Sequence, residues 1–114
     1  MGSCVNRPND IASVMRRLSK KSVLNLGYGG NGPLIQFATL VEYLPKNTEK
    51  VIWFYFEEND LDNLKNELTN EILRKYFLIN NFSQKLKYKQ KILNEEANKL
   101  IISEIEKYEN NKIL

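Results

Sequence analysis

The most informative gap in this 114-residue sequence is histidine, which is entirely absent. Without it the chain cannot build a serine or cysteine nucleophile that an imidazole base activates. Zinc sites, in which imidazole is a frequent ligand, are also disfavoured, and we expect neither a metal nor a cofactor. Only one cysteine is present, Cys4, so no internal disulfide can form. We expect Cys4 to be a small buried hydrophobic residue.

Long apolar runs are missing too. No stretch of about 18 apolar residues exists, which argues against a membrane-spanning helix. The first ten residues, MGSCVNRPND, lack the apolar segment of a signal peptide. A myristoylation signal needs Ser or Thr at the sixth position, where this chain has Asn6. The compartment is therefore unknown, with the cytoplasm as the default expectation.

Charge is nearly balanced, with 17 Lys and Arg against 14 Asp and Glu and a formal net charge of +3. The stretch KLKYKQK at 85–91 is locally basic, but a solvated face explains it more simply than phosphate contact. We therefore expect no nucleic-acid partner. A chain with 42% hydrophobic and 27% charged residues is typical of globular proteins, and its length suits one domain over 1–114.

The first half of the chain alternates helical and extended patterns. Apolar spacing predicts a helix within 9–21, with Asp10 as its N-cap, and a second helix over 33–44. Two apolar runs, SVLNL at 22–26 and VIWFYF at 51–56, are typical of buried parallel strands. The alternation predicts an α/β fold with a parallel sheet. Since two strands do not make a stable sheet, we expect a piece of a larger domain.

The second half of the chain is predicted to be helical. Asp60 is the expected N-cap of a helix that is broken near Thr69–Asn70, and 76–84 is expected to be irregular. A long helix is predicted over roughly 84–109. Six of its apolar residues share one face, namely Leu93, Ala97, Leu100, Ile101, Ile105 and Tyr108. This face belongs either to the core or to a partner surface.

The turn NLGYGGNGP, at 25–33, is the candidate site, and it allows three interpretations. Gly27, Gly29 and Gly32 fit the G-x-G-x-x-G pattern that binds dinucleotide phosphates between a strand and a helix. That pattern expects an acidic residue about 20 positions later, whereas the Glu57–Glu58 pair lies about 30 positions after Gly27. Alternatively, the glycines only turn a strand into a helix.

The third interpretation joins the glycine turn to the segment EEND at 57–60. Loops that follow successive parallel strands emerge at the same edge of a sheet, so the two segments should lie close together. A backbone amide of the turn and the side-chain amide of Asn59 could then donate to one oxygen. Two such donors make an oxyanion hole, and each typically lowers a reaction barrier by about 3 kcal/mol.

From about Cys4 to Gln84, the sequence resembles the SGNH hydrolases, also called the GDSL family, which are esterases and lipases of flavodoxin-like fold. The resemblance is carried by VLNLGYGGNGP at 23–33 and WFYFEENDL at 53–61. It implies that Gly30 and Asn59 are the two oxyanion donors. The family's third block is Gly-x-Asn-Asp, and here Glu57 replaces its glycine.

Two blocks of that family have no match in this chain. The Gly-Asp-Ser block with the nucleophile is absent, and so is the Asp-x-x-His block with the base. Ser3 lacks the preceding Asp and is no substitute. We therefore expect a partial flavodoxin-like three-layer α/β/α domain that begins just after the catalytic serine should have appeared. The chain alone should be inactive, because the oxyanion donors Gly30 and Asn59 have no nucleophile to assist.

Two other functions stay open at this point. One is a non-catalytic domain that binds a small ligand or a partner, and the other is nucleotide binding through the glycine pattern. The partner expected for the intact relative is an ester or another small-molecule substrate. Self-association through an exposed edge of the predicted sheet is a further expectation, because unpaired strand edges attract other chains.

Overall fold

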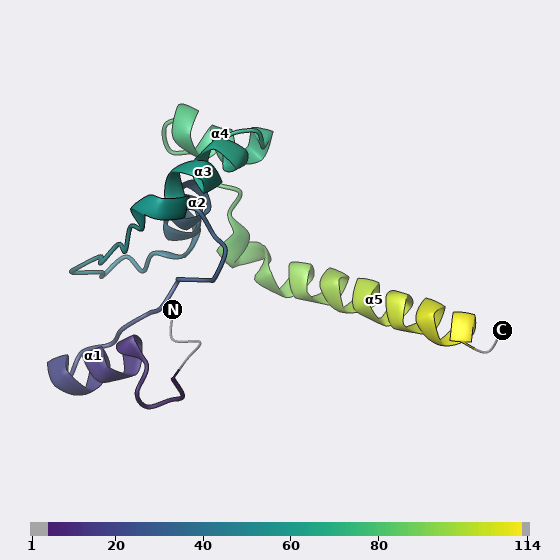
Figure 1. The fold of residues 1–114 in the computed structure, drawn as a ribbon, viewed down its shortest axis with the longest axis horizontal. Helices are drawn as coiled ribbons and strands as arrows, with labels where there is room; N and C mark the ends of the chain where they lie inside the picture. Colours follow the sequence, from purple (N-terminus) through teal and green to yellow (C-terminus); the bar gives the residue numbers. More distant parts are fainter. Residues whose placement is uncertain (1–4, 113–114) are drawn as a thin grey trace. The chain divides into compact units, whose positions relative to one another are not determined.

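The computed structural model describes residues 5–112, and within them it is entirely helical. Its five helices, drawn in Figure 1, are α1 (Ile11–Ser19), α2 (Pro33–Tyr43), α3 (Glu57–Glu67), α4 (Glu71–Leu78) and α5 (Leu86–Lys112). The described residues up to Ser83 form one compact unit, and those from Gln84 onward form a second. Each unit is described by itself below.

The predicted α/β fold is wrong for the described residues, since they contain no strand. The runs 22–26 and 51–56 are connecting segments, and the six side chains from Val51 to Phe56 are 50–58% exposed. Strand propensity depends on neighbouring strands, and neither run has one to pair with here. The predicted flavodoxin-like three-layer arrangement is therefore wrong as well. The described residues also have no sheet edge through which copies of the chain could associate.

The helix predictions fared better than the strand predictions. α1 begins after Asp10, whose Oδ1 accepts from the Ser13 amide at 3.0 Å while the Ser13 hydroxyl donates to Oδ2 at 2.6 Å. The break near Thr69–Asn70 is confirmed, because α3 ends at Glu67 and Asn70 caps α4 by accepting from two amides. The segment 76–84 is irregular only after Leu78, where α4 ends.

Helix α2 is capped by a side chain from a distant part of the sequence. Its own N-cap residue, Gly32, has no side chain to offer. The carboxylate of Glu67, at the end of α3, accepts instead from the Gly32 amide at 2.7 Å and from the Leu34 amide at 2.8 Å. A third, longer contact of 3.4 Å joins it to the Ile35 amide. One buried carboxylate thus satisfies the open amides of α2 and fastens α3 to it.

The close approach of Glu67 explains why position 32 is glycine. A Cβ atom built on Gly32 would lie 2.6 Å from Glu67 Oε1 and 2.6 Å from Asn63 Cβ, which is closer than real Cβ contacts. Gly29 differs, because a Cβ there would meet nothing within 4 Å. Gly32 is therefore needed for the packing of α3 against the start of α2, and Gly29 is not.

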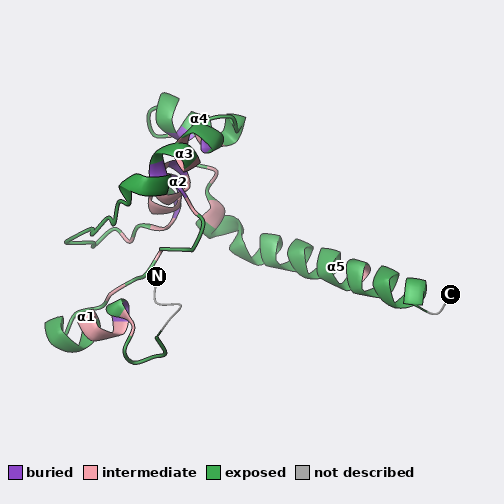
Figure 2. Ribbon diagram, in the orientation of Figure 1, coloured by how far each residue is buried: buried purple, intermediate pink, exposed green. Residues whose placement is uncertain are grey.

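The small core of the first unit lies where α2 meets α3 and α4 (Figure 2). Leu34, Ala38 and Tyr76 are its buried apolar members in this region. The Tyr76 hydroxyl donates to the buried carboxylate of Glu42, which joins α4 to α2. The Tyr76 ring also packs edge-on against Phe82, with centroids 4.9 Å apart. Side-chain hydrogen bonds thus join these helices in addition to the apolar contacts.

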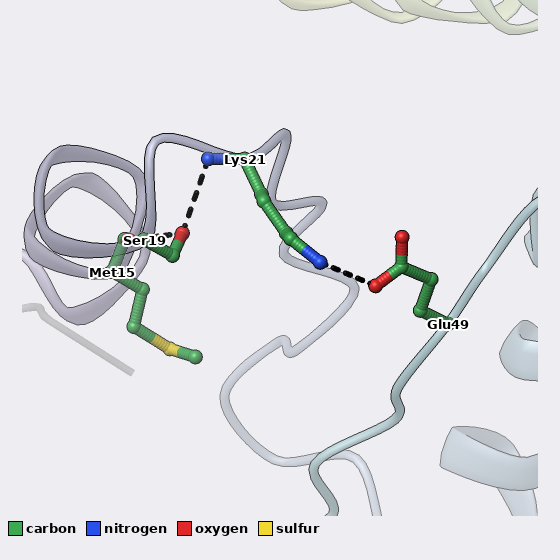
Figure 3. A network of polar contacts seen from close by, with 4 residues as sticks. All are labelled: Met15, Ser19, Lys21 and Glu49. Carbon is green, nitrogen blue, oxygen red and sulfur yellow. Dashed lines mark hydrogen bonds and ion pairs between the residues drawn. The ribbon is translucent and has the colours of Figure 1, made fainter.

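Polar contacts also link α1 to the segments that follow it. The Arg16 guanidinium donates twice to the Val23 carbonyl, at 2.9 and 2.7 Å. In Figure 3 the Lys21 amide donates to the Ser19 hydroxyl, and the Lys21 ammonium pairs with the Glu49 carboxylate. Both side chains of that ion pair are about two-thirds exposed, so it contributes little stability.

The packing at position 32 gives a first prediction. Gly32→Ala should lower the free energy of unfolding by about 1–3 kcal/mol, because the new methyl group must push Glu67 and Asn63 away. Gly29→Ala is the matched control and should change stability by less than about 0.5 kcal/mol. Urea unfolding followed by circular dichroism measures both. Equal stability of the two variants would contradict the role assigned to Glu67.

The cap of α1 gives a second prediction. The hydrogen bond from the Ser13 hydroxyl, followed by the one from its amide, lowers the pKa of Asp10 below its ordinary value. The cap therefore stabilises the fold above that ordinary value, and its contribution is lost as the pH falls through the lower folded pKa. Ser13→Ala should raise the Asp10 pKa, measured by NMR titration. Ser19→Ala is the control at the other end of α1, and it should leave that pKa unchanged.

Candidate functional site

The glycine turn is tight, and one of its residues has a backbone conformation that favours glycine. The Asn31 amide donates to the Tyr28 carbonyl at 3.4 Å, which closes a four-residue turn. Gly30, the third residue of that turn, has a φ of +85°, a conformation that residues with a side chain rarely adopt. A positive φ at this position is the mark of a type II turn. Glycine at position 30 is thus required by the backbone itself.

The first turn of α3 forms the opposite side of the candidate site. The prediction that Asp60 is the N-cap is wrong, because α3 begins at Glu57 and Phe56 is its N-cap. Asp60 is buried within the first turn, and its Oδ2 accepts from the Phe56 amide at 2.6 Å. This bond fixes the start of α3. It places Asn59 in the same turn, where its side chain is exposed.

Gly30 and Asn59 line the same open hollow of about 470 Å³. The third interpretation of the turn requires these two residues to lie close together. Helix α3, and not a sheet, brings the segment 57–60 to the glycine turn. The hollow lies wholly within the first unit. Its lining consists of Gly30, Asn31, Gln36, Phe54, Tyr55, Phe56, Asn59, Asp60 and Asn63.

Gln36, on α2, holds two sides of the hollow together. Its Nε2 donates to the Asn31 carbonyl at 2.9 Å, and its Oε1 accepts from the indole nitrogen of Trp53. The same side chain therefore ties the glycine turn to the aromatic segment 51–56. The sequence carried no signal for this role, because a glutamine on a helix is ordinary and its two partners lie 5 and 17 residues away.

The lining of the hollow is neutral and partly aromatic. Side-chain amides come from four residues, aromatic rings come from 54–56, and no lysine or arginine is present. The single carboxylate, Asp60, is already bonded to the Phe56 amide. Such a surface favours an uncharged group that accepts hydrogen bonds and is attached to an apolar body. An anionic ligand would meet no positive charge here.

The amides that a phosphate would need are engaged elsewhere. The Gly27 amide donates to Asn25 Oδ1 at 2.9 Å, and the Gly32 amide donates to Glu67. The N-terminus of α2, which is the usual anion site after a glycine turn, thus already holds a carboxylate of the chain itself. The geometry gives no support to nucleotide binding through Gly27, Gly29 and Gly32.

Other candidate residues add no chemistry to this site. Ser3 and Cys4 lie outside the described residues. Among the residues that are described, no three or more carboxylate, cysteine or histidine side chains gather as a metal site would require. No helix in residues 5–112 has the length and apolar character to cross a membrane. No protein-family model, curated protein or solved structure matches this chain.

The Gln36 bridge gives a third prediction. Trp53 is the single tryptophan, so all tryptophan fluorescence of the chain comes from the indole that bonds to Gln36. Gln36→Ala removes the acceptor of the indole N–H, and the emission maximum should shift to the red as water replaces it. Gln36→Glu keeps an acceptor at the same place and should shift the emission less. Identical spectra for all three proteins would show that the bridge does not form in solution.

Proposed function

We propose that the first unit is a non-catalytic domain that binds a small uncharged ligand through a carbonyl oxygen. One observation carries this proposal, namely that Gly30 and Asn59 line one hollow together with the aromatic rings of 54–56. The amides would donate to the carbonyl, and the rings would cover the apolar part of the ligand. Amides, esters and ketones with an aromatic or aliphatic body fit this description.

Asn59 is the residue on which recognition depends most. Its carboxamide is exposed at the hollow and makes no side-chain hydrogen bond within the described part of the chain. A ligand oxygen could therefore be bound without breaking an existing contact. Asp60, its neighbour, is not available in the same way because it is bonded to the Phe56 amide.

Chemistry beyond binding is not part of the proposal. The chain contains no histidine, and the residues that line the hollow include no serine, threonine, cysteine or lysine. A site that has hydrogen-bond donors for an oxyanion, but neither a nucleophile nor a base, can bind an ester without cleaving it. A relationship to the SGNH hydrolases stays a proposal that rests on the resemblance and on this pair of donors, with no support from the fold.

NMR spectroscopy tests the binding proposal with 4-nitroacetanilide, a stable amide that carries an aromatic ring. Its addition to the ¹⁵N-labelled chain should shift the Gly30 amide and the Asn59 side-chain amide signals. Asn59→Ala should weaken binding about tenfold, the equivalent of one lost hydrogen bond. Asn66→Ala is the matched control, because Asn66 is exposed on the same helix and does not line the hollow. Shifts that survive Asn59→Ala unchanged would refute the assignment.

A turnover assay separates binding from catalysis. The chain should release p-nitrophenol from p-nitrophenyl acetate no faster than buffer does, since it lacks a base-activated nucleophile in the hollow. The control is the Asn59→Ala variant at the same concentration, which should behave identically. Turnover that depends on Asn59 would overturn the non-catalytic part of the proposal and would favour an ester hydrolase.

A further inference from the structure

The sequence contains a single Asn–Gly pair, Asn31–Gly32, and it lies where the glycine turn enters α2. An asparagine before glycine is the asparagine most prone to lose its side-chain amide spontaneously, because glycine has no Cβ to hinder attack by its own nitrogen. Asn31 is half-buried and lines the open hollow, so water reaches it. Its carboxamide makes no hydrogen bond within the part of the chain that the structure describes.

The reaction at such a pair joins the Gly32 nitrogen to Cγ of Asn31. A new C–N bond closes a succinimide ring, the bond from Cγ to the side-chain nitrogen breaks, and ammonia leaves with the proton of the Gly32 amide. Water then opens the ring at either carbonyl and yields aspartate or isoaspartate. The rate therefore depends on how freely the Gly32 nitrogen moves toward Cγ and loses its proton.

The peptide group that would react is held at both of its polar atoms. The Asn31 carbonyl accepts from Gln36 Nε2 at 2.9 Å, and the Gly32 amide donates to Glu67 Oε1 at 2.7 Å. We call these two bonds the 31–32 clamp. The carbonyl and the amide of a trans peptide lie on opposite edges of one rigid plane. The clamp therefore fixes the orientation of that plane from both sides.

Glu67 opposes the reaction by its charge as well as by its position. Loss of the Gly32 proton places negative charge on a nitrogen that lies next to a carboxylate, and like charges disfavour each other. Glu67 is only 8% exposed, so water screens this repulsion poorly. The space around Gly32 is also filled, since an added Cβ would lie 2.6 Å from both Glu67 Oε1 and Asn63 Cβ.

We propose that Asn31 is a deamidation site that the 31–32 clamp keeps closed while α3 is packed against α2. The modification then marks chains in which Glu67 has left the start of α2. Isoaspartate adds a methylene group to the main chain just before Gly32, where the packing has no room for it, and so the clamp does not close again. Either product adds a negative charge to a hollow lined by no lysine or arginine.

Mass spectrometry of the full chain, digested after incubation in mildly alkaline buffer, tests this proposal. Deamidation at Asn31 should be at least about tenfold slower in the native wild type than in the same chain unfolded in urea. Glu67→Gln should speed the native reaction at least about tenfold, because it weakens the charge-assisted bonds to the amides of α2. Glu58→Gln, at an exposed position of α3, is the matched control and should leave the rate unchanged.

A second variant tests the other bond of the clamp. Gln36→Glu removes the donor to the Asn31 carbonyl and keeps an acceptor for the Trp53 indole. It should also speed deamidation, by a smaller factor than Glu67→Gln does, because a bond between neutral groups is weaker than one to a carboxylate. An unchanged rate would remove Gln36 from the clamp.

Tyr76→Phe distinguishes opening of the clamp from general loss of stability. It removes the buried bond to Glu42 and leaves the contacts of the 31–32 peptide group in place. Compared at equal free energy of unfolding, set with urea, it should speed deamidation at Asn31 less than Glu67→Gln does. Equal rates would show that unfolding of the whole unit controls the reaction, and would overturn the proposal.

The comparison of native and unfolded chains also decides whether the site exists. A native wild type that reacts at Asn31 as fast as the unfolded chain would refute the clamp, and no reaction in either state would refute the site. Slower deamidation in Glu67→Gln would show that the carboxylate acts as a base for the Gly32 proton, which is the reverse of the role assigned to it.

Discussion

The fold of the first unit depends on one carboxylate at the start of one helix. Glu67 accepts from the Gly32 and Leu34 amides, and its position fixes how α3 lies against α2. Because α3 begins at Glu57, this contact also fixes the positions of Asn59 and Asp60 in its first turn. The candidate hollow is thus a consequence of helix capping over 35 residues of sequence. A core with few large buried side chains makes such a polar contact more important.

The same contact explains why the glycine turn was ambiguous. A turn that leads into a helix exposes several amides, and an anion of any origin satisfies them. Nucleotide-binding proteins use a phosphate for this purpose, whereas this chain uses its own glutamate. The tight approach at Gly32 serves that glutamate, and the positive φ at Gly30 serves the turn. Two glycines of one motif therefore have separate structural reasons.

Local signals predicted the helices, and tertiary partners decided the rest. Asp10, Pro33 and Asn70 act at helix ends through neighbours within a few residues, so spacing alone located α1, α2 and the break before α4. The strands at 22–26 and 51–56 needed partners that no local pattern can supply. In the hollow, Gly30 and Asn59 were predicted together at a sheet edge, whereas residues 5–112 contain no sheet and helix α3 brings the two together. The Gln36 bridge and the Glu67 cap join distant segments and had no sequence signature.

The half-exposed segment 51–56 has a consequence for the behaviour of the protein at high concentration. Six consecutive residues with bulky β-branched or aromatic side chains, no charge and no proline have the composition of segments that stack into cross-β fibrils. Lys50 and Glu57 flank this segment directly and act as gatekeepers, because stacking identical chains in register would bring like charges together. Two charged residues outside the core thus oppose the stacking that the composition of this exposed segment favours.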